Sequence, residues 1–250
     1  MPRTAREKSG TGIYHVMIRG INRQTMFNDD EDNEKFIQTL AECKKISGFK
    51  LYGYCLMGNH VHLLIKEEKE KIEKIFRRIG ARYVYWYNWK YKRSGHLFQD
   101  RFKSEAVEND AYLITVLRSI HQNPTKAGLC KRLNEYKWSS YCEYVGKDGL
   151  TDVAFVLDII GRDNIERYMN EQSNDRMLEI EEENKRLTNI ELSEKIFNEL
   201  KIKAITIQNE QKDKKHSLLK EILKYEGVSA RQISRVTGIS ANVIWKIASE

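Results

Sequence analysis

The chain has 250 residues, of which 40% are hydrophobic, and a formal net charge of +7. This length supports one sizeable core and a smaller module. No apolar run approaches the roughly 20 residues of a membrane span, and the opening MPRTAREKSG lacks the apolar stretch of a secretory signal. These features argue against a membrane-spanning or secreted protein. We expect a cytoplasmic protein whose four cysteines, which show no Cys-x-x-Cys spacing, are buried free thiols, with zinc binding as the weaker alternative.

The positive charge lies mainly in the first part of the chain. Residues 1–150 hold 27 Lys and Arg against 18 Asp and Glu, residues 151–213 hold 9 against 15, and residues 214–250 hold 7 against 3. This order of basic body, acidic connector and basic tail, with aromatic residues interleaved, suits a polyphosphate partner such as a nucleic acid. A protein that is merely basic is the alternative, which composition alone does not exclude.

Apolar periodicity and turn residues predict the elements of the body in chain order. They are a strand at 12–20, a helix at 29–47, strands at 49–57 and 60–68 joined by a tight turn, a helix at 69–92, a strand at 102–108, and a helix from Asp110 that Asn123-Pro124 is expected to end. The order β-α-β-β-α-β-α begins with a ferredoxin-like split βαβ arrangement. We therefore predict an α+β fold, an antiparallel sheet with helices on one face, followed by a helical C-terminal region.

Charge and pattern divide the chain into three predicted segments, at 1–146, 147–213 and 214–250, of which the second is an acidic helical connector. The last segment has the pattern of a helix-turn-helix. Ser229 and Ser240 each precede a short apolar helix, Gly238 supplies the turn, and Val243, Ile244 and Ile247 are expected to point inward. We favour DNA binding, with Asn242 and Lys246 as readers, over a small packing or dimerisation element.

Two histidines stand one residue apart in MGNHVHLLIK, residues 57–66. Residues i and i+2 of a strand share a face at a spacing of roughly 6.5–7 Å, so His60 and His62 are neighbours. Imidazole is a common metal ligand, although strand histidines also serve as hydrogen-bonding groups. On the predicted helix that begins at Asp110, Ser119 and Asn123 share a face, and the amide oxygen of Asn123 is positioned for a cation. Such an open set of ligands suits Mg²⁺ or Mn²⁺ better than a closed zinc site.

Three segments resemble the single-tyrosine HUH transposases of IS elements and their REP-associated relatives: GNHVHLLI, GHLFQDRFKSEAV and IHQNPTKAGL. The likeness extends from about residue 8 to 146 and implies a HUH transposase-like domain at 1–146. It implies that His60, His62 and Asn123 bind Mg²⁺ or Mn²⁺. It also implies cleavage and rejoining of single-stranded DNA at hairpin ends, through a tyrosine that forms a 5′-phosphotyrosine during DNA transposition.

Ser119 occupies the nucleophile position, four residues before Asn123, where the family has tyrosine. The serine hydroxyl lies closer to the backbone, and its pKa is well above the ~10 of tyrosine. Tyr112 lies seven positions earlier, about 10 Å away along the helix. Three hypotheses stay open: an active transposase, a domesticated and catalytically inactive DNA-binding or regulatory protein, and a transcription factor that works through its tail. The intact HVH motif and Asn123 argue against the third.

Further DNA contacts are predicted from basic and polar residues inside the family motifs, namely Arg19, Asn22, Arg23, Arg101 and Lys103. For each of the arginines a solvated side chain is an equal alternative. The aromatic residues between 83 and 91 are expected in the core or in a homodimer interface. His15, His96 and His121 have no predicted partner and are interpreted as structural or surface residues.

Overall fold

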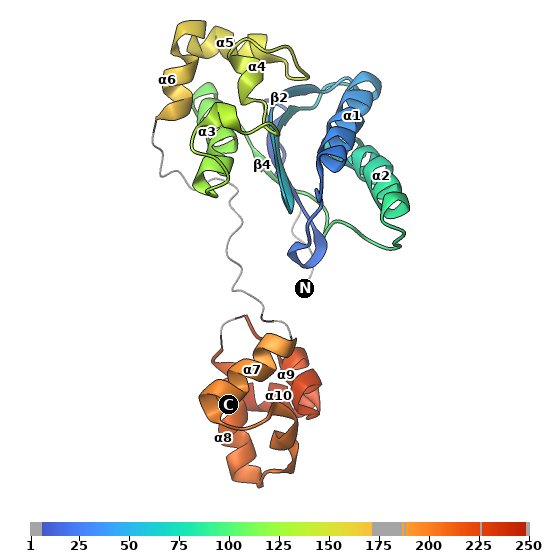
Figure 1. The fold of residues 1–250 in the computed structure, drawn as a ribbon, viewed down its shortest axis with the longest axis vertical. Coiled ribbons are helices and arrows are strands. Elements are labelled where there is room, and N and C mark those ends of the chain that lie inside the picture. Colours follow the sequence, from blue (N-terminus) through green and yellow to red (C-terminus); the bar gives the residue numbers. More distant parts are fainter. Residues whose placement is uncertain (1–6, 172–186, 188, 226, 249–250) are drawn as a thin grey trace. The chain divides into compact units, whose positions relative to one another are not determined.

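The computed structural model describes residues 7–171, 187, 189–225 and 227–248. They divide into two compact units, one within residues 1–179 and one within 180–250 (Figure 1). Part of the predicted connector, residues 172–186 and 188, lies outside the described residues. In the ranges that are described, no helix is long and apolar enough to cross a membrane.

The first unit is built on a four-stranded sheet in the order β2-β3-β1-β4, with every neighbouring pair antiparallel. Its strands are β1 (Ile13–Arg19), β2 (Lys50–Met57), β3 (His60–Lys66) and β4 (Lys103–Ala106). Two long helices, α1 (Asp30–Ser47) and α2 (Ile72–Lys90), bury their apolar stripes on one face of this sheet. The predicted ferredoxin-like split βαβ arrangement is confirmed, with α1 and α2 together on one face (Figure 1).

Helix α3 (Asp110–Lys126) covers the opposite face of the sheet (Figure 1). Its apolar side, which includes Leu113, Val116 and Leu117, packs on the residues of β2 and β3 that point away from α1 and α2. Gly53 on β2 permits this close approach, because a Cβ atom at that position would lie 2.4 Å from Cδ1 of Leu117. The sheet is therefore covered on both faces, and the side chains beneath α3 are largely withdrawn from water.

The prediction that Asn123-Pro124 ends this helix is wrong. Pro124 lies inside α3, which continues to Lys126. Proline lacks a backbone N–H and so removes only one hydrogen bond of the helix. The following turn keeps its backbone hydrogen bonds: the N–H of Ala127 donates to the carbonyl of Asn123 at 2.9 Å, and the N–H of Leu129 donates to the carbonyl of Pro124 at 2.9 Å. The actual stop is Gly128, whose φ of 70° gives the left-handed termination of a Schellman motif. At the other end, the cap is Asn109 rather than Asp110.

The segment after α3 completes the core on the α3 side of the sheet. It contains a short 3-10 turn η2 (Leu133–Glu135), α4 (Tyr141–Tyr144), α5 (Val153–Ile160), η3 (Arg162–Asn164) and α6 (Ile165–Asn170). Buried residues of α5 and α6, among them Leu157 and Met169, pack in the same cluster as α3. Residues 147–170 of the predicted acidic connector thus belong to the core of the first unit.

The second unit is entirely helical in its described part. It contains α7 (Asn189–Leu200), η4 (Ala204–Asn209), α8 (Lys212–Leu223), α9 (Ala230–Thr237) and α10 (Ala241–Ala248) around one apolar core. Ser229 caps α9 by accepting the N–H of Gln232 at 3.2 Å, and Gly238 turns the chain with φ 75°. Val243, which was expected to point inward, is 45% exposed, because α10 buries Ile244 and Ile247 instead.

Candidate functional site

His60 and His62 lie side by side on β3, on the sheet face covered by α3. In the register with β1, His60 pairs with Arg19 and His62 pairs with Met17. The two imidazole rings meet edge to face, with centroids 5.1 Å apart, and His62 is only 3% exposed. Alternation along the strand sends Val61 and Leu63 to the opposite core, below α1 and α2. The structure therefore brings the two candidate metal ligands together at one end of a buried face.

The Nδ1 atom of each histidine has a hydrogen-bond partner within the protein. His60 Nδ1 lies 2.7 Å from Oδ1 of Asn59, and His62 Nδ1 lies 3.0 Å from Nε2 of His15. Among the described residues, neither Nε2 takes part in a hydrogen bond. The Nε2 atoms are thus the nitrogens that remain for an external ligand.

Both rings are held in the neutral form. Burial lowers the pKa of His60 to about 4, and the positive charge of Arg19 adds to this effect. Burial also lowers the pKa of His62 well below its usual range, with the neighbouring rings of His15 and His60 contributing. A neutral imidazole offers a lone pair to a cation, so this environment prepares both side chains for ligation at physiological pH.

The loop after β1 is anchored to the histidine pair through Asn59. A 3-10 turn, η1 (Ile21–Arg23), contains two successive residues with left-handed backbone, Asn22 at φ 51° and Arg23 at φ 60°. Non-glycine residues seldom adopt this conformation, which carries a cost that the surroundings must offset. Asn59 does so by donating from Nδ2 to the carbonyl of Arg23 at 3.3 Å while facing His60. The exposed side chains of Asn22 and Arg23 are therefore held beside the site.

Two more of the predicted DNA contacts lie at the edge strand. Lys103 pairs with Met17 across β4 and β1, and Met17 pairs with His62, so all three share a face. Two strand spacings place Lys103 roughly 10 Å from His62 along the sheet. Arg101, just before β4, is exposed and lines a pocket on the other face. The edge strand and the residues just before it thus carry basic side chains on both sides of the sheet.

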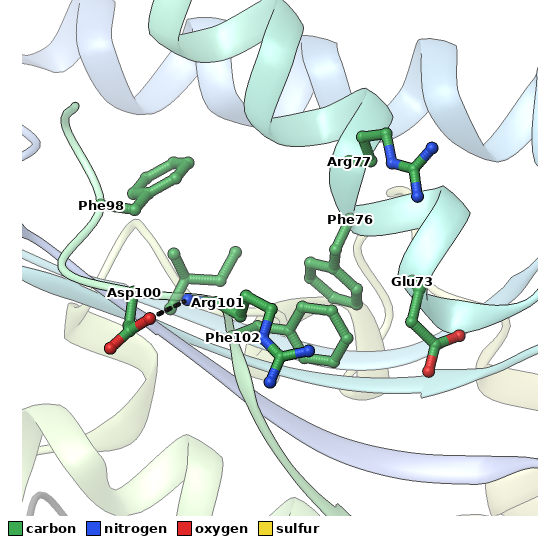
Figure 2. Close-up of a pocket in the computed structure, with 8 residues that line it drawn as sticks. Glu73, Phe76, Arg77, Phe98, Asp100, Arg101 and Phe102 are labelled. Atoms are coloured by element: carbon green, nitrogen blue, oxygen red, sulfur yellow. Dashed lines mark hydrogen bonds between the residues drawn. The ribbon is translucent and has the colours of Figure 1, made fainter. Parts of the chain in front are cut away.

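That pocket has a volume of about 340 Å³ and lies between α2 and the segment that leads into β4 (Figure 2). Its apolar lining comes from Ile18, Phe76, Phe98 and Phe102, and charged residues stand at its rim, namely Glu73, Arg77, Asp100 and Arg101. The rings of Phe76 and Phe102 are in contact, with centroids 4.6 Å apart (Figure 2). The pocket is flanked by two guanidinium groups, those of Arg77 and Arg101.

Ser119 and Asn123 lie on α3 as the helical spacing requires, with Ser119 8% exposed and Asn123 half-buried. In the described part of the chain, no hydrogen bond joins either side chain to the histidine pair. Nowhere in the described part of the chain do three or more His, Cys, Asp or Glu side chains form a group suited to a metal ion. The role of Asn123 as a third ligand therefore stays a prediction.

Tyr112, the other candidate nucleophile on α3, points to β4. Its hydroxyl donates a short hydrogen bond to Oε1 of Glu105. Burial raises the pKa of Tyr112 well above its usual range, and the hydrogen bond and negative charge of Glu105 raise it further. This phenol is held protonated and is already engaged with a side chain of the protein.

Three residues of this neighbourhood were missed from the sequence: Asn59, His15 and Glu105. His15 was interpreted as structural or surface, yet it is 1% exposed and contacts His62. The available signal is the alternation His15, Met17, Arg19 on a strand, which places all three on one face. His121 is also buried, but it bonds to Oγ of Ser140 at 2.8 Å.

A split βαβ sheet with two histidines side by side on a central strand is the architecture that the sequence motifs imply for HUH transposases. Residues 9–123, a little under half of the chain, match the family described as IS200-like transposases. The resemblance expected from the motifs is confirmed. This match includes β1 to β4 and α3 as far as Asn123.

The solved structures that are similar to the chain include two transposases. One is a REP-associated tyrosine transposase bound to a REP hairpin, with a TM-score of 0.52 and 17% identity over 61% of this chain and 90% of that one. The other is a candidate transposase from Deinococcus radiodurans R1, with a TM-score of 0.35 and 14% identity over 54% of this chain and 98% of that one. No curated protein shows a significant match to this chain.

Proposed function

We propose that this protein binds single-stranded or hairpin DNA through a transposase-like domain that holds Mg²⁺ or Mn²⁺ at His60 and His62. The observation that carries this proposal is the pair of neutral imidazoles whose Nδ1 atoms are both engaged. Their Nε2 atoms are consequently the only ring nitrogens on offer to a cation. The match to IS200-like transposases supports DNA as the partner, and the REP-associated neighbour was solved with a hairpin.

The donor set fits a divalent cation with open positions. Two imidazole nitrogens, with the amide oxygen of Asn123 as the proposed third ligand, leave room for water and for phosphate oxygens. A cation bound there would polarise a phosphate of the DNA backbone. The protein contributes two uncharged imidazoles, because burial lowers the pKa of both histidines.

The proposed route of the DNA backbone is based on the charged and polar side chains around His60 and His62. Arg19 and Lys103 share the histidine face, and Asn22 and Arg23 extend from the anchored loop. We propose that these side chains contact phosphates, because such contacts position the strand without reading sequence. Arg101 stands at the rim of the phenylalanine-lined pocket, which suits an unpaired base, since bases stack on aromatic side chains.

Cleavage is the step we propose to be missing. Ser119 holds the nucleophile position with a short, buried hydroxyl, and Tyr112 is protonated and bound to Glu105. The protein then acts as a catalytically inactive member that binds and protects or regulates hairpin DNA. The competing function, an active transposase that attacks with another tyrosine, predicts a covalent protein–DNA adduct in the wild-type chain.

The second unit is proposed to add a helix-turn-helix contact to duplex DNA. Asn242 and Lys246 are both exposed on α10, which follows α9 after the turn at Gly238. A homodimer is proposed to form through the aromatic residues of α2, where Tyr85 is 79% and Trp89 is 73% exposed. Four free cysteines accord with a cytoplasmic place of action.

The test measures Mn²⁺ binding by calorimetry and binding of a labelled hairpin by fluorescence anisotropy. We expect His60→Ala/His62→Ala to abolish Mn²⁺ binding, while His96→Ala, which removes an exposed histidine elsewhere, leaves it unchanged. Hairpin affinity should exceed that for plain duplex and fall steeply with salt, because phosphate contacts release counterions. Equal Mn²⁺ affinity in the double variant, or salt-independent DNA binding, would refute the proposal.

A further inference from the structure

His15 is a buried histidine that contacts one of the two proposed ligands. It lies on β1, next to β3, with its Nε2 3.0 Å from Nδ1 of His62 and the ring centroids 5.2 Å apart. It is 1% exposed and therefore lies inside the core of the first unit. A buried polar ring is costly unless its nitrogens are satisfied, which raises the question of where the single proton of each neutral ring lies.

The second nitrogen of His15 faces a carboxylate. Glu105 is the cross-strand partner of His15 on β4, and its Oε2 lies 3.9 Å from Nδ1 of His15. The hydroxyl of Tyr112 donates to the other oxygen of the same carboxylate and fixes its orientation. His15 Nδ1 itself is buried and makes no hydrogen bond within the part of the chain that is described. The negatively charged group that faces that nitrogen is therefore Glu105.

This charge selects one tautomer of His15. A proton on Nδ1 faces the carboxylate and is attracted to it, whereas a lone pair on Nδ1 would face a negative charge. With its proton on Nδ1, His15 can only accept at Nε2. His62 must then donate from Nδ1, which leaves the lone pair of His62 on Nε2. The opposite arrangement would place a proton on Nε2 of His62 and block that atom as a ligand.

The same tautomer is imposed on His60 by an independent contact. Asn59 donates from Nδ2 to the carbonyl of Arg23 at 3.3 Å, which fixes the orientation of its amide group. Oδ1 of Asn59 therefore faces His60, and because a carbonyl oxygen only accepts, Nδ1 of His60 must carry the proton. Two unrelated partners thus leave both Nε2 atoms unprotonated.

We propose that Glu105 and His15 form a relay that holds His62 in the Nδ1–H tautomer and thereby keeps its Nε2 available to a divalent cation. His15 is a positioning residue in this scheme, because it touches His62 and not the cation. The inference rests on the proposed function only for the identity of the ligand. The order of contacts from Tyr112 through Glu105 and His15 to His62 is a property of the protein alone.

The first measurement is Mn²⁺ affinity of the full chain by calorimetry. His15→Ala should weaken binding by about 10- to 100-fold, the usual effect of removing an outer partner of a metal-binding histidine. His15→Gln should recover most of the affinity, since its amide oxygen accepts from His62. His121→Gln is the matched control, because it replaces another fully buried histidine that bonds to Ser140 and should leave Mn²⁺ affinity unchanged.

The second measurement needs no metal. Long-range ¹H–¹⁵N correlation spectra of the metal-free protein report which ring nitrogen of each histidine is protonated. We expect Nδ1–H for His15, His60 and His62 in the wild-type chain, and a shift of His62 toward Nε2–H in His15→Ala. Glu105→Gln, which removes the charge, should produce a mixture of tautomers at His15.

The outcomes separate this inference from the proposed function. Unchanged Mn²⁺ affinity in a folded His15→Ala variant, or an Nε2–H tautomer of His62 in the wild-type chain, would overturn the relay and leave the proposed function intact. A wild-type chain that has the expected tautomers but binds no Mn²⁺ would overturn the proposed function, and with it the purpose assigned to the relay.

Discussion

Replacing Ser119 by tyrosine tests the proposal that a missing nucleophile separates this protein from a cleaving transposase. The substitution moves the hydroxyl oxygen about 4 Å further from the backbone and lowers its pKa toward ~10. Reach of this size is decisive, because a misplacement of about 1 Å can cost about 100-fold in rate. Ser119 is 8% exposed, so the larger ring should also cost about 1–3 kcal/mol of folding free energy through overpacking. That loss is tolerable against a typical stability of about 5–15 kcal/mol.

The assay incubates a labelled hairpin oligonucleotide with Mn²⁺ and looks for a covalent adduct on a denaturing gel. We expect no adduct with the wild-type chain and a metal-dependent 5′-phosphotyrosine with Ser119→Tyr. Ser119→Phe is the matched control, since it has the same bulk without a hydroxyl and should give none. A strong wild-type adduct mapped to Tyr112 or another tyrosine would refute the reasoning. So would a folded, Mn²⁺-binding Ser119→Tyr variant that forms no adduct.

Three further predictions concern the scaffold. Gly53→Ala should lower the free energy of unfolding by about 1–3 kcal/mol in urea titrations, because its Cβ would meet Leu117, whereas Gly58→Ala, which faces open space, should not. Burial lowers the pKa of His121 to about 3, so the unfolded chain binds the proton more readily, and stability should fall below about pH 6.5. At pH 5 this histidine alone should cost about 2 kcal/mol, and His121→Gln should flatten that part of the pH profile. Removing residues 180–250 should leave the first unit folded by circular dichroism and Mn²⁺-binding, while hairpin affinity falls through the loss of a linked module.

The sheet and its first two helices could be predicted because their signals are local. Alternation along β1 and β3 and the acid-first, lysine-last pattern of α1 each lie within one element. The end of α3 could not be predicted from Pro124, because a proline in the last turn removes only one bond and Gly128 supplies the real stop. Residues 147–170 were predicted as part of a connector because the prediction rested on their acidic charge. Their apolar stretches are short, and those that pack in the core include Val156 and Leu157.

The candidate site also has one feature that a local pattern predicts and others that depend on distant segments. The pairing of His60 and His62 follows from strand periodicity, which is local. The contact between His15 and His62 depends on the register of β1 against β3, with Met17 rather than His15 opposite His62, and no local pattern reveals a diagonal neighbour. The tie from Asn59 to the loop of Arg23 depends equally on how two distant turns meet.

The cost of this arrangement argues that the first unit is more than a scaffold. His15 and His62 are almost fully buried beneath α3, where apolar side chains of similar volume would pack without any hydrogen bonds to satisfy. Replacing such a polar pair by apolar residues is often neutral or stabilising, so folding alone gives no reason for it. Two strained residues, Asn22 and Arg23, add a further local cost at the same end of the sheet. We infer that a structure that carries these costs together, around two ring nitrogens that we propose to be unprotonated, is arranged for a ligand, even with a serine at the proposed nucleophile position.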